Sequence, residues 1–353
     1  MVIKIGEHAV GGESPCFIIV EASSNHGRDL RRAKKMIEVA AESGADAIKF
    51  QLFTAEKIAA DTDDPRTIVR SAEKGVFVDK DTKLIDMYRA VELPREWLPE
   101  LADFAKTQGI LFLATPFDAE AVDLLEQIDA PAYKVASYEL LDVPLLRKIA
   151  STKKPVILST GMAILGEIEF SLQTLQTNHA IILHCNSTYP VPPENVNLRA
   201  METLSRAFPQ CVIGFSDHSL GTCIPLAAAA RGAKVIEKHF FLDDGVRTLD
   251  DKFSLTPAEL KKLIQEIRSV EQALGTSEKK PSPLEEREKI QARRSLWIVK
   301  DIQEGELLTS QNIESLRPGI GLSPRYYDLV IGKKATHPLK AGHPLEWQDL
   351  TVK

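Results

Sequence analysis

One repeated unit governs the first 240 residues of this chain. Eight times, a short apolar run stops at a polar or charged residue, and helix-like sequence follows. The stops are Glu21, Lys49, Thr115, Lys134, Ser159, His184, Ser216 and His239. Continuous apolar runs are typical of strands buried on both faces, and their alternation with helices is typical of a parallel sheet. The pattern predicts an α/β fold, a (β/α)8 TIM barrel, with its active site at the carboxyl ends of the strands.

The expected elements follow from this pattern. We expect strands at 17–20, 47–50, 110–114, 132–136, 156–158, 180–183, 212–215 and 235–236. We expect helices at 30–43, 96–107, 120–128, 145–150, 167–175, 198–208 and 257–274. One interval is too long for a simple connection, because residues 54–95 form a polar, charged insertion. Long loops in compact domains are often functional, so this segment is either a substrate-side excursion or an ordinary surface loop.

The length indicates a second module. A barrel of this type takes about 250 residues, and the chain has 353. We place the barrel at 1–275 and a linker rich in charge, Pro and Ser at 276–291. Residues 292–353 change to short β-type runs separated by turns, which predicts a small, mainly β module. A module of about 60 residues is marginally stable alone and gains stability by docking on another surface.

Composition excludes several classes of protein. Apolar residues make up 44% of the chain and charged residues 27%, as in ordinary globular proteins. The net charge of −6 and the lack of a basic stripe argue against a nucleic-acid partner. No segment resembles a signal peptide or reaches the roughly 18 apolar residues of a membrane span. We therefore expect a cytoplasmic protein that does not bind membranes.

The four cysteines, Cys16, Cys185, Cys211 and Cys223, have no CxxC spacing. Intracellular proteins normally keep such thiols reduced. We expect all four to be small core residues, with only Cys185 near the active site.

Two histidines fall at the ends of the last two predicted strands, His218 in GFSDHS and His239 in IEKHF. Neighbouring strands of a barrel bring such side chains together at its mouth. Two imidazoles there suit a divalent cation that keeps open positions for water or substrate. The alternative is two independent, hydrogen-bonded histidines.

Two lysines, Lys49 and Lys134, also end predicted strands. A lysine there is costly to bury unless it is paired. The hydroxyls near the same rim belong to Thr115, Ser137, Ser159, Ser187 and Ser216. Together these donors suit a phosphate and a carboxylate. The alternatives are a Schiff-base lysine and lysines that only pair with carboxylates such as Glu21 or Glu237.

Three acidic residues could serve this site. Glu21 closes the first strand, and among cations it should stay ionised, ready to position a water, to remove a proton or to act as a passive counter-ion. Glu237 lies two residues before His239 and so on the same strand face, where it could contact substrate or support a metal. Asp250 follows the last strand and either hydrogen-bonds a polyhydroxylated substrate or lies in a solvated turn.

Nine ordered segments, EASSNHG, DAIKFQ, ATPFD, YKVASYE, ILSTGM, HCNSTYP, GFSDHS, IEKHF and RPGIGL, together resemble the sialic acid synthase family over nearly the whole chain. The resemblance implies condensation of phosphoenolpyruvate with an open-chain N-acetylated amino sugar, giving a nine-carbon 2-keto acid and phosphate. It also implies an antifreeze-like (SAF, β-clip) C-terminal module. In the family this module reaches the partner's barrel in a homodimer.

The resemblance implies a role for each candidate. It places Mn²⁺ or Mg²⁺ on His218 and His239, and makes Glu21 the catalytic carboxylate. It assigns phosphoenolpyruvate to Lys49, Thr115, Lys134, Ser137, Ser159, Ser187 and Ser216. It assigns the sugar to Gln51, Tyr189, Glu237 and Asp250, with Arg317 reaching in from the C-terminal module.

Within the family, ASYE, the EW of LPREW, STYP and DDKFSL are most similar to the pseudaminic acid synthase branch. This resemblance implies 2,4-diacetamido-2,4,6-trideoxy-altrose as the sugar. The alternatives in the family are N-acetylneuraminate, legionaminic acid and spore-coat polysaccharide synthases. Outside it stand a Schiff-base aldolase using Lys134 or Lys49 and a carbohydrate-binding protein without activity.

Overall fold

The computed structural model describes residues 1–70, 78, 80–177 and 179–351. The chain forms two compact units, Met1–Gly275 and Thr276–Lys353. The first unit ends with helix α11 (Pro257–Leu274), which begins with a capping box between Thr256 and Glu259. Gly275 follows it at φ 53°, a conformation that glycine adopts without the steric cost of a side chain.

The first unit is a barrel of eight parallel strands. They are β3 (Phe17–Glu21), β4 (Ala47–Leu52), β7 (Leu111–Pro116), β8 (Tyr133–Val135), β9 (Val156–Ser159), β10 (Ile181–Cys185), β11 (Val212–Asp217) and β12 (Val235–His239). Their hydrogen-bonded order is β7-β4-β3-β12-β11-β10-β9-β8, and contact between β7 and β8 closes the barrel. The predicted TIM barrel and all eight predicted strands are confirmed.

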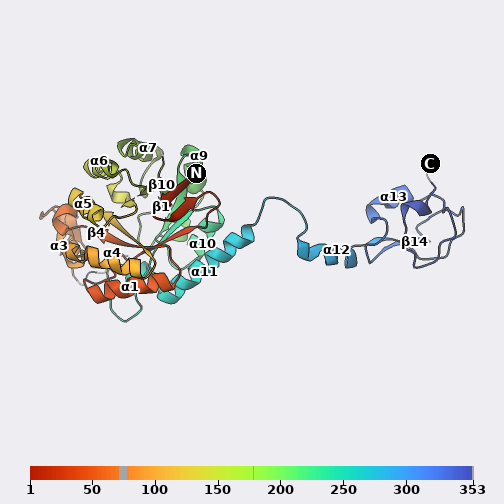
Figure 1. Ribbon diagram of the computed structural model, residues 1–353, viewed down its shortest axis with the longest axis horizontal. Helices are drawn as coiled ribbons and strands as arrows, with labels where there is room; N and C mark the ends of the chain where they lie inside the picture. The colour runs from red at the N-terminus through yellow and green to blue at the C-terminus, as the bar shows by residue number, and fades with distance from the viewer. Residues whose placement is uncertain (71–77, 79, 178, 352–353) are drawn as a thin grey trace. The chain divides into compact units, whose positions relative to one another are not determined.

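Helices surround these strands (Figure 1). They are α1 (Leu30–Glu42), α4 (Leu98–Thr107), α5 (Ala119–Gln127), α6 (Val143–Thr152), α7 (Leu165–Thr174), α9 (Ala200–Ala207), α10 (Cys223–Ala230) and α11. All seven predicted helices are present. The unpredicted one, α10, has the sequence CIPLAAAA, which is apolar on all sides and so lacks a helical period of polar residues.

The barrel interior has an apolar end and a polar end. Side chains alternate between the interior and the helices along each strand, so the first interior positions of neighbouring strands form one layer. The apolar layers at the amino-terminal end contain Phe17, Ile19 and Val235, packed with Ile5 and Val10 of the hairpin β1 (Val2–Ile5) and β2 (His8–Gly11). This hairpin was not predicted. The interior positions near the carboxyl ends are polar, which leaves chemistry at one end only.

The insertion at 54–95 has structure of its own. It contains α2 (Ala55–Ile58), the 3-10 turn Pro65–Thr67, the short antiparallel pair β5 (Ile68–Val69) and β6 (Thr82–Lys83), and α3 (Leu84–Val91). Residues 71–77 and 79 of the insertion lie outside the described residues. The segment is therefore more than a plain surface loop, and α3 contributes side chains to a cavity considered below.

The second unit has its own apolar core. Strand β13 (Ser295–Ile298) pairs antiparallel with β14 (Ile313–Leu316), and short bridges and turns follow, with one short helix, α13 (Tyr327–Val330). Buried residues such as Leu296, Val330 and Leu345 pack inside it. The predicted small, mainly β module is confirmed. Before it, the segment predicted as a linker contains a short helix, α12 (Glu286–Gln291).

The cysteine prediction is wrong at one position. Cys16, Cys185 and Cys211 are buried, but Cys223 is exposed at the start of α10. No amphipathic pattern in the CIPLAAAA segment could have shown which side faces solvent. None of these four cysteines forms a disulfide.

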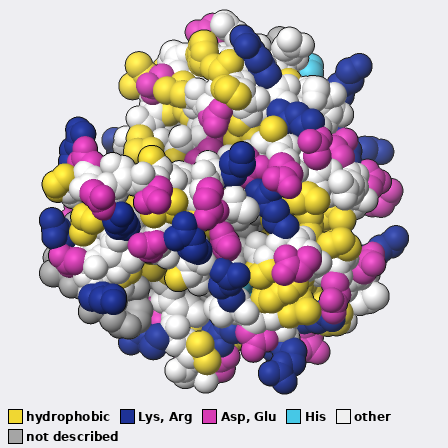
Figure 2. Space-filling view, turned by 90° about the vertical axis from the view of Figure 1, so that its left-hand side faces the viewer, with side chains coloured by type: hydrophobic (Ala, Val, Ile, Leu, Met, Phe, Trp, Pro, Cys, Tyr) yellow, Lys and Arg dark blue, Asp and Glu magenta, His cyan; other side chains and the backbone are white. Residues whose placement is uncertain are grey.

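The surface carries mixed charges. On the face in Figure 2, acidic and basic side chains alternate over the whole surface, and neither sign forms a large continuous region. Within the described ranges, no helix combines the length and the apolar character needed to cross a membrane.

Candidate active site

A ring of buried polar side chains lies at the carboxyl ends of the barrel strands. It contains Glu21, Lys49, Thr115, Lys134, Ser159, Ser216 and Glu237, each nearly inaccessible to solvent. All seven line one cavity. The interior position on β10 belongs to Cys185, whose Sγ lies 3.7 Å from Nδ1 of His218. The sequence pattern predicts His184 as the polar residue that ends this strand. The His184 side chain instead contacts the carbonyl oxygen of Val196.

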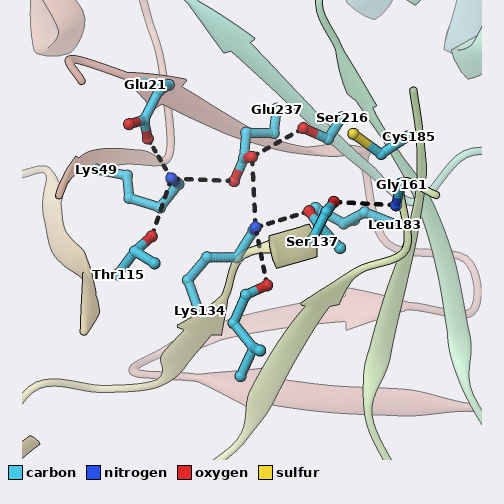
Figure 3. Close-up of polar contacts among 12 residues, drawn as sticks. Glu21, Lys49, Thr115, Lys134, Ser137, Gly161, Leu183, Cys185, Ser216 and Glu237 are labelled. Carbon is cyan, nitrogen blue, oxygen red and sulfur yellow. Dashed lines mark hydrogen bonds and ion pairs between the residues drawn. The ribbon is translucent and has the colours of Figure 1, made fainter. Parts of the chain in front are cut away.

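Lys49 is held by three side chains. Its Nζ pairs with Oε2 of Glu21, donates to Oγ1 of Thr115 at 3.2 Å, and lies 3.6 Å from Oε2 of Glu237 (Figure 3). Burial alone would lower the pKa of Lys49, but the two carboxylates outweigh it and raise that pKa. Lys49 is therefore a fixed cation.

Lys134 approaches the same glutamate from the other side. Its Nζ donates to Oγ of Ser159 at 2.7 Å and lies 3.7 Å from Oε1 of Glu237. Ser216 also donates to that Glu237 oxygen, at 2.9 Å (Figure 3). Burial lowers the pKa of Lys134 in spite of Glu237. The two lysines thus share Glu237, and their free donors face one small cavity.

The two carboxyl groups differ in their affinity for protons. Burial raises the pKa of Glu21 although Lys49 acts against it. Burial acts in the same direction on Glu237, but Lys134 and Lys49 outweigh it and lower the pKa of Glu237. Of the two carboxyl groups, Glu237 therefore holds a proton less tightly, and Glu21 is the group better suited to accept one.

Hydroxyl groups form a cradle beside Lys134. The backbone N–H of Gly161 donates to Oγ of Ser137 at 2.9 Å, and Oγ of Ser187 is buried without a hydrogen-bond partner. A Cβ on residue 161 would lie 2.1 Å from Oγ of Ser187 and 2.9 Å from Oγ of Ser137. A side chain at this position would therefore have to displace these hydroxyl groups. Gly161 was not predicted, although its place just after β9 in the STGM segment could have indicated a site residue.

The two histidines lie side by side, as predicted. Their ring centroids are 5.3 Å apart. Nδ1 of His218 contacts the carbonyl oxygen of Asn186 at 2.8 Å, which fixes that ring. Burial lowers the pKa of His218 to about 4 and that of His239 well below its usual value, so both rings are neutral.

The histidine pair fits a divalent cation. Neutral imidazole is the form that binds metals, and Nδ1 of His239 is buried without a hydrogen-bond partner. Among the residues that the structure describes, no three His, Cys, Asp or Glu side chains are placed to share one ion. The pair would therefore supply two ligands and leave the others to water or substrate.

A buried ion pair lies directly behind the histidines. Lys238 precedes His239 and Asp217 precedes His218, and Nζ of Lys238 lies 2.6 Å from Oδ2 of Asp217. Ser219 donates from its backbone N–H and its hydroxyl to Oδ1 of Asp217, at 3.0 and 2.7 Å. Because side chains alternate along a strand, this pair points away from the cavity that the histidines face. It joins β11 to β12 where both histidines are attached.

Beyond the histidines lies a second cavity of about 200 Å³. Gln51, Tyr189 and Asp250, all predicted to contact the sugar, line it. The Tyr189 ring lies 4.1 Å from that of His218, between centroids. Nε2 of Gln51 donates to Oε1 of Glu21 at 3.2 Å, and Ser24 donates to Oδ2 of Asp250 at 3.3 Å.

Phe253 and Tyr138 are among the residues of this cavity that were not predicted. The rings of Phe253 and His239 are 5.1 Å apart, and Tyr138 lines both cavities. Phe253 lies in KFSL and Tyr138 in ASYE, both parts of segments quoted above. Their positions in these segments were the signal that could have indicated them. Arg317, the remaining predicted site residue, is exposed at the end of β14 in the second unit.

The volume of a cavity does not identify the active site. A cavity of about 560 Å³ beside α7 and α9 is lined largely by apolar side chains such as Met162, Ile164 and Leu204. It contains none of the predicted substrate or metal residues. The concentration of buried charge distinguishes the smaller cavities at the barrel mouth.

Known proteins match both units of the chain. Residues 36–279 match the NeuB family model, and residues 293–351 match the SAF domain. A relative from Campylobacter jejuni, N,N'-diacetyllegionaminic acid synthase, is 43% identical over 92% of this chain and 97% of its own length. The pseudaminic acid synthase of the same species is 38% identical over 94% and 96%.

A solved structure agrees with these relatives. The N-acetylneuraminic acid synthetase of Leptospira borgpetersenii superposes with a TM-score of 0.72 at 34% identity, covering 82% of this chain and 95% of that one. The SAF match confirms the antifreeze-like module predicted at the carboxyl end. With a polar ring at the barrel mouth, a matching second module and relatives aligned over nearly their full length, the chain belongs to the NeuB family of sialic acid synthases and is an enzyme.

Proposed function

We propose that this enzyme condenses phosphoenolpyruvate with an open-chain 2,4-diacetamido-2,4,6-trideoxy hexose and water, giving a nonulosonic acid and phosphate. The observation that carries the proposal is the ring in which Lys49 and Lys134 share Glu237 next to the paired histidines. Relatives that cover more than nine-tenths of the chain are named as synthases of such acids.

The lysines would act electrostatically. Phosphoenolpyruvate carries a phosphate and a carboxylate, and inside a small, buried cavity Lys49 offers a fixed cation and Lys134 a second N–H donor. Ser137, Ser159 and Ser187 add hydroxyl donors on the Lys134 side. Preorganised donors stabilise developing charge without reorganising during the reaction. The same groups would orient C3 of phosphoenolpyruvate towards the histidines.

His218 and His239 would hold Mn²⁺ or Mg²⁺. A bound divalent cation supplies Lewis acidity to the aldehyde oxygen of the sugar. The histidines' own contribution is their position: Asn186 fixes one ring, and Phe253 and Tyr189 pack against the pair. These rings also exclude bulk water from the reacting carbon.

Glu21 would direct the water. C3 of phosphoenolpyruvate bonds to the aldehyde carbon, positive charge develops at C2, and a water oxygen adds there. Glu21 accepts the proton that the water loses, and this proton balances the one that the new hydroxyl group takes up. The C2–O bond to phosphate then breaks and its electrons leave with the phosphate, while the C2 hydroxyl group gives its proton to the departing phosphate and becomes the ketone. Burial, which raises the pKa of Glu21, suits it to accept this proton.

The configuration of the sugar has two candidates. The DDKFSL and ASYE segments favour the altro sugar and hence pseudaminic acid, whereas the higher identity of the legionaminic acid synthase favours the manno sugar. The test is phosphate release from phosphoenolpyruvate with each sugar, with N-acetylmannosamine and without sugar. We expect turnover with one diacetamido sugar. Release without dependence on any of these sugars would refute the proposal.

An aldolase mechanism remains the competing chemistry. The lowered pKa of Lys134 is also what an imine-forming lysine requires. Because phosphoenolpyruvate has no carbonyl group at C2, borohydride reduction in the presence of pyruvate and sugar separates the two mechanisms. We expect no covalent adduct, and a reduced adduct on Lys134 or Lys49 would favour the aldolase.

Arg317 would complete the sugar site from a second copy of the chain in a homodimer. Replacing a charge-assisted hydrogen bond costs about 1.5–3 kcal/mol, so Arg317→Ala should lower kcat/KM by roughly 10- to 150-fold. Mixing this variant with a Glu21→Gln variant should restore part of the activity, because mixed dimers then contain one intact site. Failure to restore any activity would count against the shared site. The four cysteines, none of which forms a disulfide, fit a cytoplasmic location.

A further inference from the structure

The insertion between β4 and β7 forms one wall of the active site. Met87, Tyr88 and Val91 of α3 line the 200 Å³ cavity. That cavity shares Gln51, Tyr138, Tyr189 and His239 with the cavity above the lysines. It therefore extends from the histidines in the direction away from Lys134. A sugar with its aldehyde at the histidines would place its far carbons there.

The two sides of this cavity differ in chemistry. One side carries Ser23, Ser24 and Asp250, which hydrogen-bond one another. The other side is apolar: the ring of Phe53 lies 5.3 Å from that of Tyr88, between centroids, and Met87 and Val91 continue it. Phe53 is 2% exposed, and Met87, Tyr88 and Val91 are half-buried.

The sequence of α3, LIDMYRAV, explains this orientation. Met87 and Val91 are four residues apart and share one face of the helix. Asp86 and Arg89 point to solvent, where they pair with each other at 2.7 Å. Burial raises the pKa of Tyr88 to about 12, which keeps its phenol neutral. The inner face of α3 is therefore uncharged and mainly apolar.

Resting on the proposed function, we infer that Met87, Tyr88 and Val91 determine specificity for the far end of the sugar. A methyl group buried against this wall loses contact with water at no polar cost. A hydroxyl group placed against Met87, Val91 or Phe53 would lose its hydrogen bonds to water and find no partner on these side chains. The wall thus selects an acceptor with a deoxy carbon and an acyl methyl group over the same acceptor with a terminal hydroxyl.

The experiment compares two acceptors of the same configuration, the 2,4,6-trideoxy sugar and its 6-hydroxy counterpart, with saturating phosphoenolpyruvate. A hydrophobic pocket discriminates such pairs by about 10- to 200-fold. We expect the wild type to prefer the deoxy sugar in kcat/KM within that range. Met87→Gln and Val91→Thr keep similar side-chain sizes and should each lower the preference several-fold, with KM for phosphoenolpyruvate unchanged.

Ala90→Gln is the matched control, because Ala90 is exposed on the same helix and should leave the preference unaltered. Turnover without a preference in the wild type, or with an unaltered preference in both wall variants, would overturn the inference and leave the proposed function standing. Equal loss with both acceptors and a raised KM for phosphoenolpyruvate would also overturn it, since α3 would then only support the fold. Absence of phosphate release with every acceptor would refute the proposed function itself.

Discussion

Removing one partner of the ion pair behind the histidines should destabilise the barrel. Lys238 is 1% exposed and Asp217 is equally buried. In Lys238→Met, the Asp217 carboxylate keeps its two hydrogen bonds from Ser219 but loses its only cation within the described residues. Breaking a buried pair from one side costs about 3–5 kcal/mol. Because Ser219 still solvates the anion, we expect the lower end, about 3 kcal/mol.

The assay should report on the barrel alone. Trp97 is the barrel's only tryptophan, and the other two, Trp297 and Trp347, belong to the second unit. In a background with both of these changed to Phe, urea denaturation followed by Trp97 fluorescence gives the free energy of unfolding of the barrel. Lys148→Met is the matched control. Its ion pair with Asp123 is 2.5 Å long but 34% and 57% exposed, so its loss should cost at most about 1 kcal/mol.

A second variant separates the charge from the packing. Adding Asp217→Asn to Lys238→Met removes the unpaired charge, so the double variant should recover more than half of the loss. If Lys238→Met is as stable as Lys148→Met, the pair contributes little and the argument fails. If the double variant is no more stable than the single one, lost packing rather than an unpaired charge explains the effect.

Three further predictions concern the two histidines, Gly161 and Glu139. His218→Ala and His239→Ala should each abolish Mn²⁺ retention in equilibrium dialysis while the circular dichroism spectrum is unchanged; retention by both variants would place the ion elsewhere. Gly161→Ala should raise KM for phosphoenolpyruvate at least tenfold, because its Cβ displaces the hydroxyl of Ser187, and an unchanged KM would mean that the cradle does not bind the substrate. Burial raises the pKa of Glu139 from its usual 4.5 to about 7, so its contribution to stability is complete below pH 4.5 and lost as the pH rises through 7. Between pH 5 and 8, the free energy of unfolding of Glu139→Gln should therefore fall by roughly 3 kcal/mol less than that of the wild type. Urea denaturation at each pH measures this difference. Parallel curves of free energy against pH for the two proteins would contradict the raised pKa.

The sequence predicted the barrel because each strand carries its own signal. An apolar run buried on both faces and a polar residue at its end are local features, and they place Glu21, Lys49 and Lys134 correctly without knowledge of the fold. The histidines follow the same logic on β11 and β12. The same local features do not determine the last residue of a strand. On β10 they predicted His184, whereas Cys185 holds the interior position. A shift of one residue there exchanges the cavity side for the helix side.

Features that depend on contacts between distant segments could not be predicted this way. The need for glycine at 161 arises from Ser137 and Ser187, which come from other strand–helix units. The apolar wall arises because α3 of the insertion meets Phe53. The charged composition of residues 54–95 concealed this helix, since only one of its faces is apolar and the helix spans two turns.

The lysines show that two interpretations of a sequence pattern need not exclude each other. Sequence analysis left open whether Lys49 and Lys134 bind substrate or only pair with carboxylates, and the structure pairs both with Glu237. Stability does not explain this arrangement, because burying such pairs costs as much desolvation as the attraction returns. The Asp217–Lys238 pair satisfies its charges with close contacts, whereas Oε2 of Glu237 has no hydrogen bond and the lysines stand 3.6 and 3.7 Å from its oxygens. Because Glu237 pairs only loosely with the two lysines, their ammonium groups keep N–H donors for an incoming anion. The carboxylates thus hold the lysines in place before substrate binds.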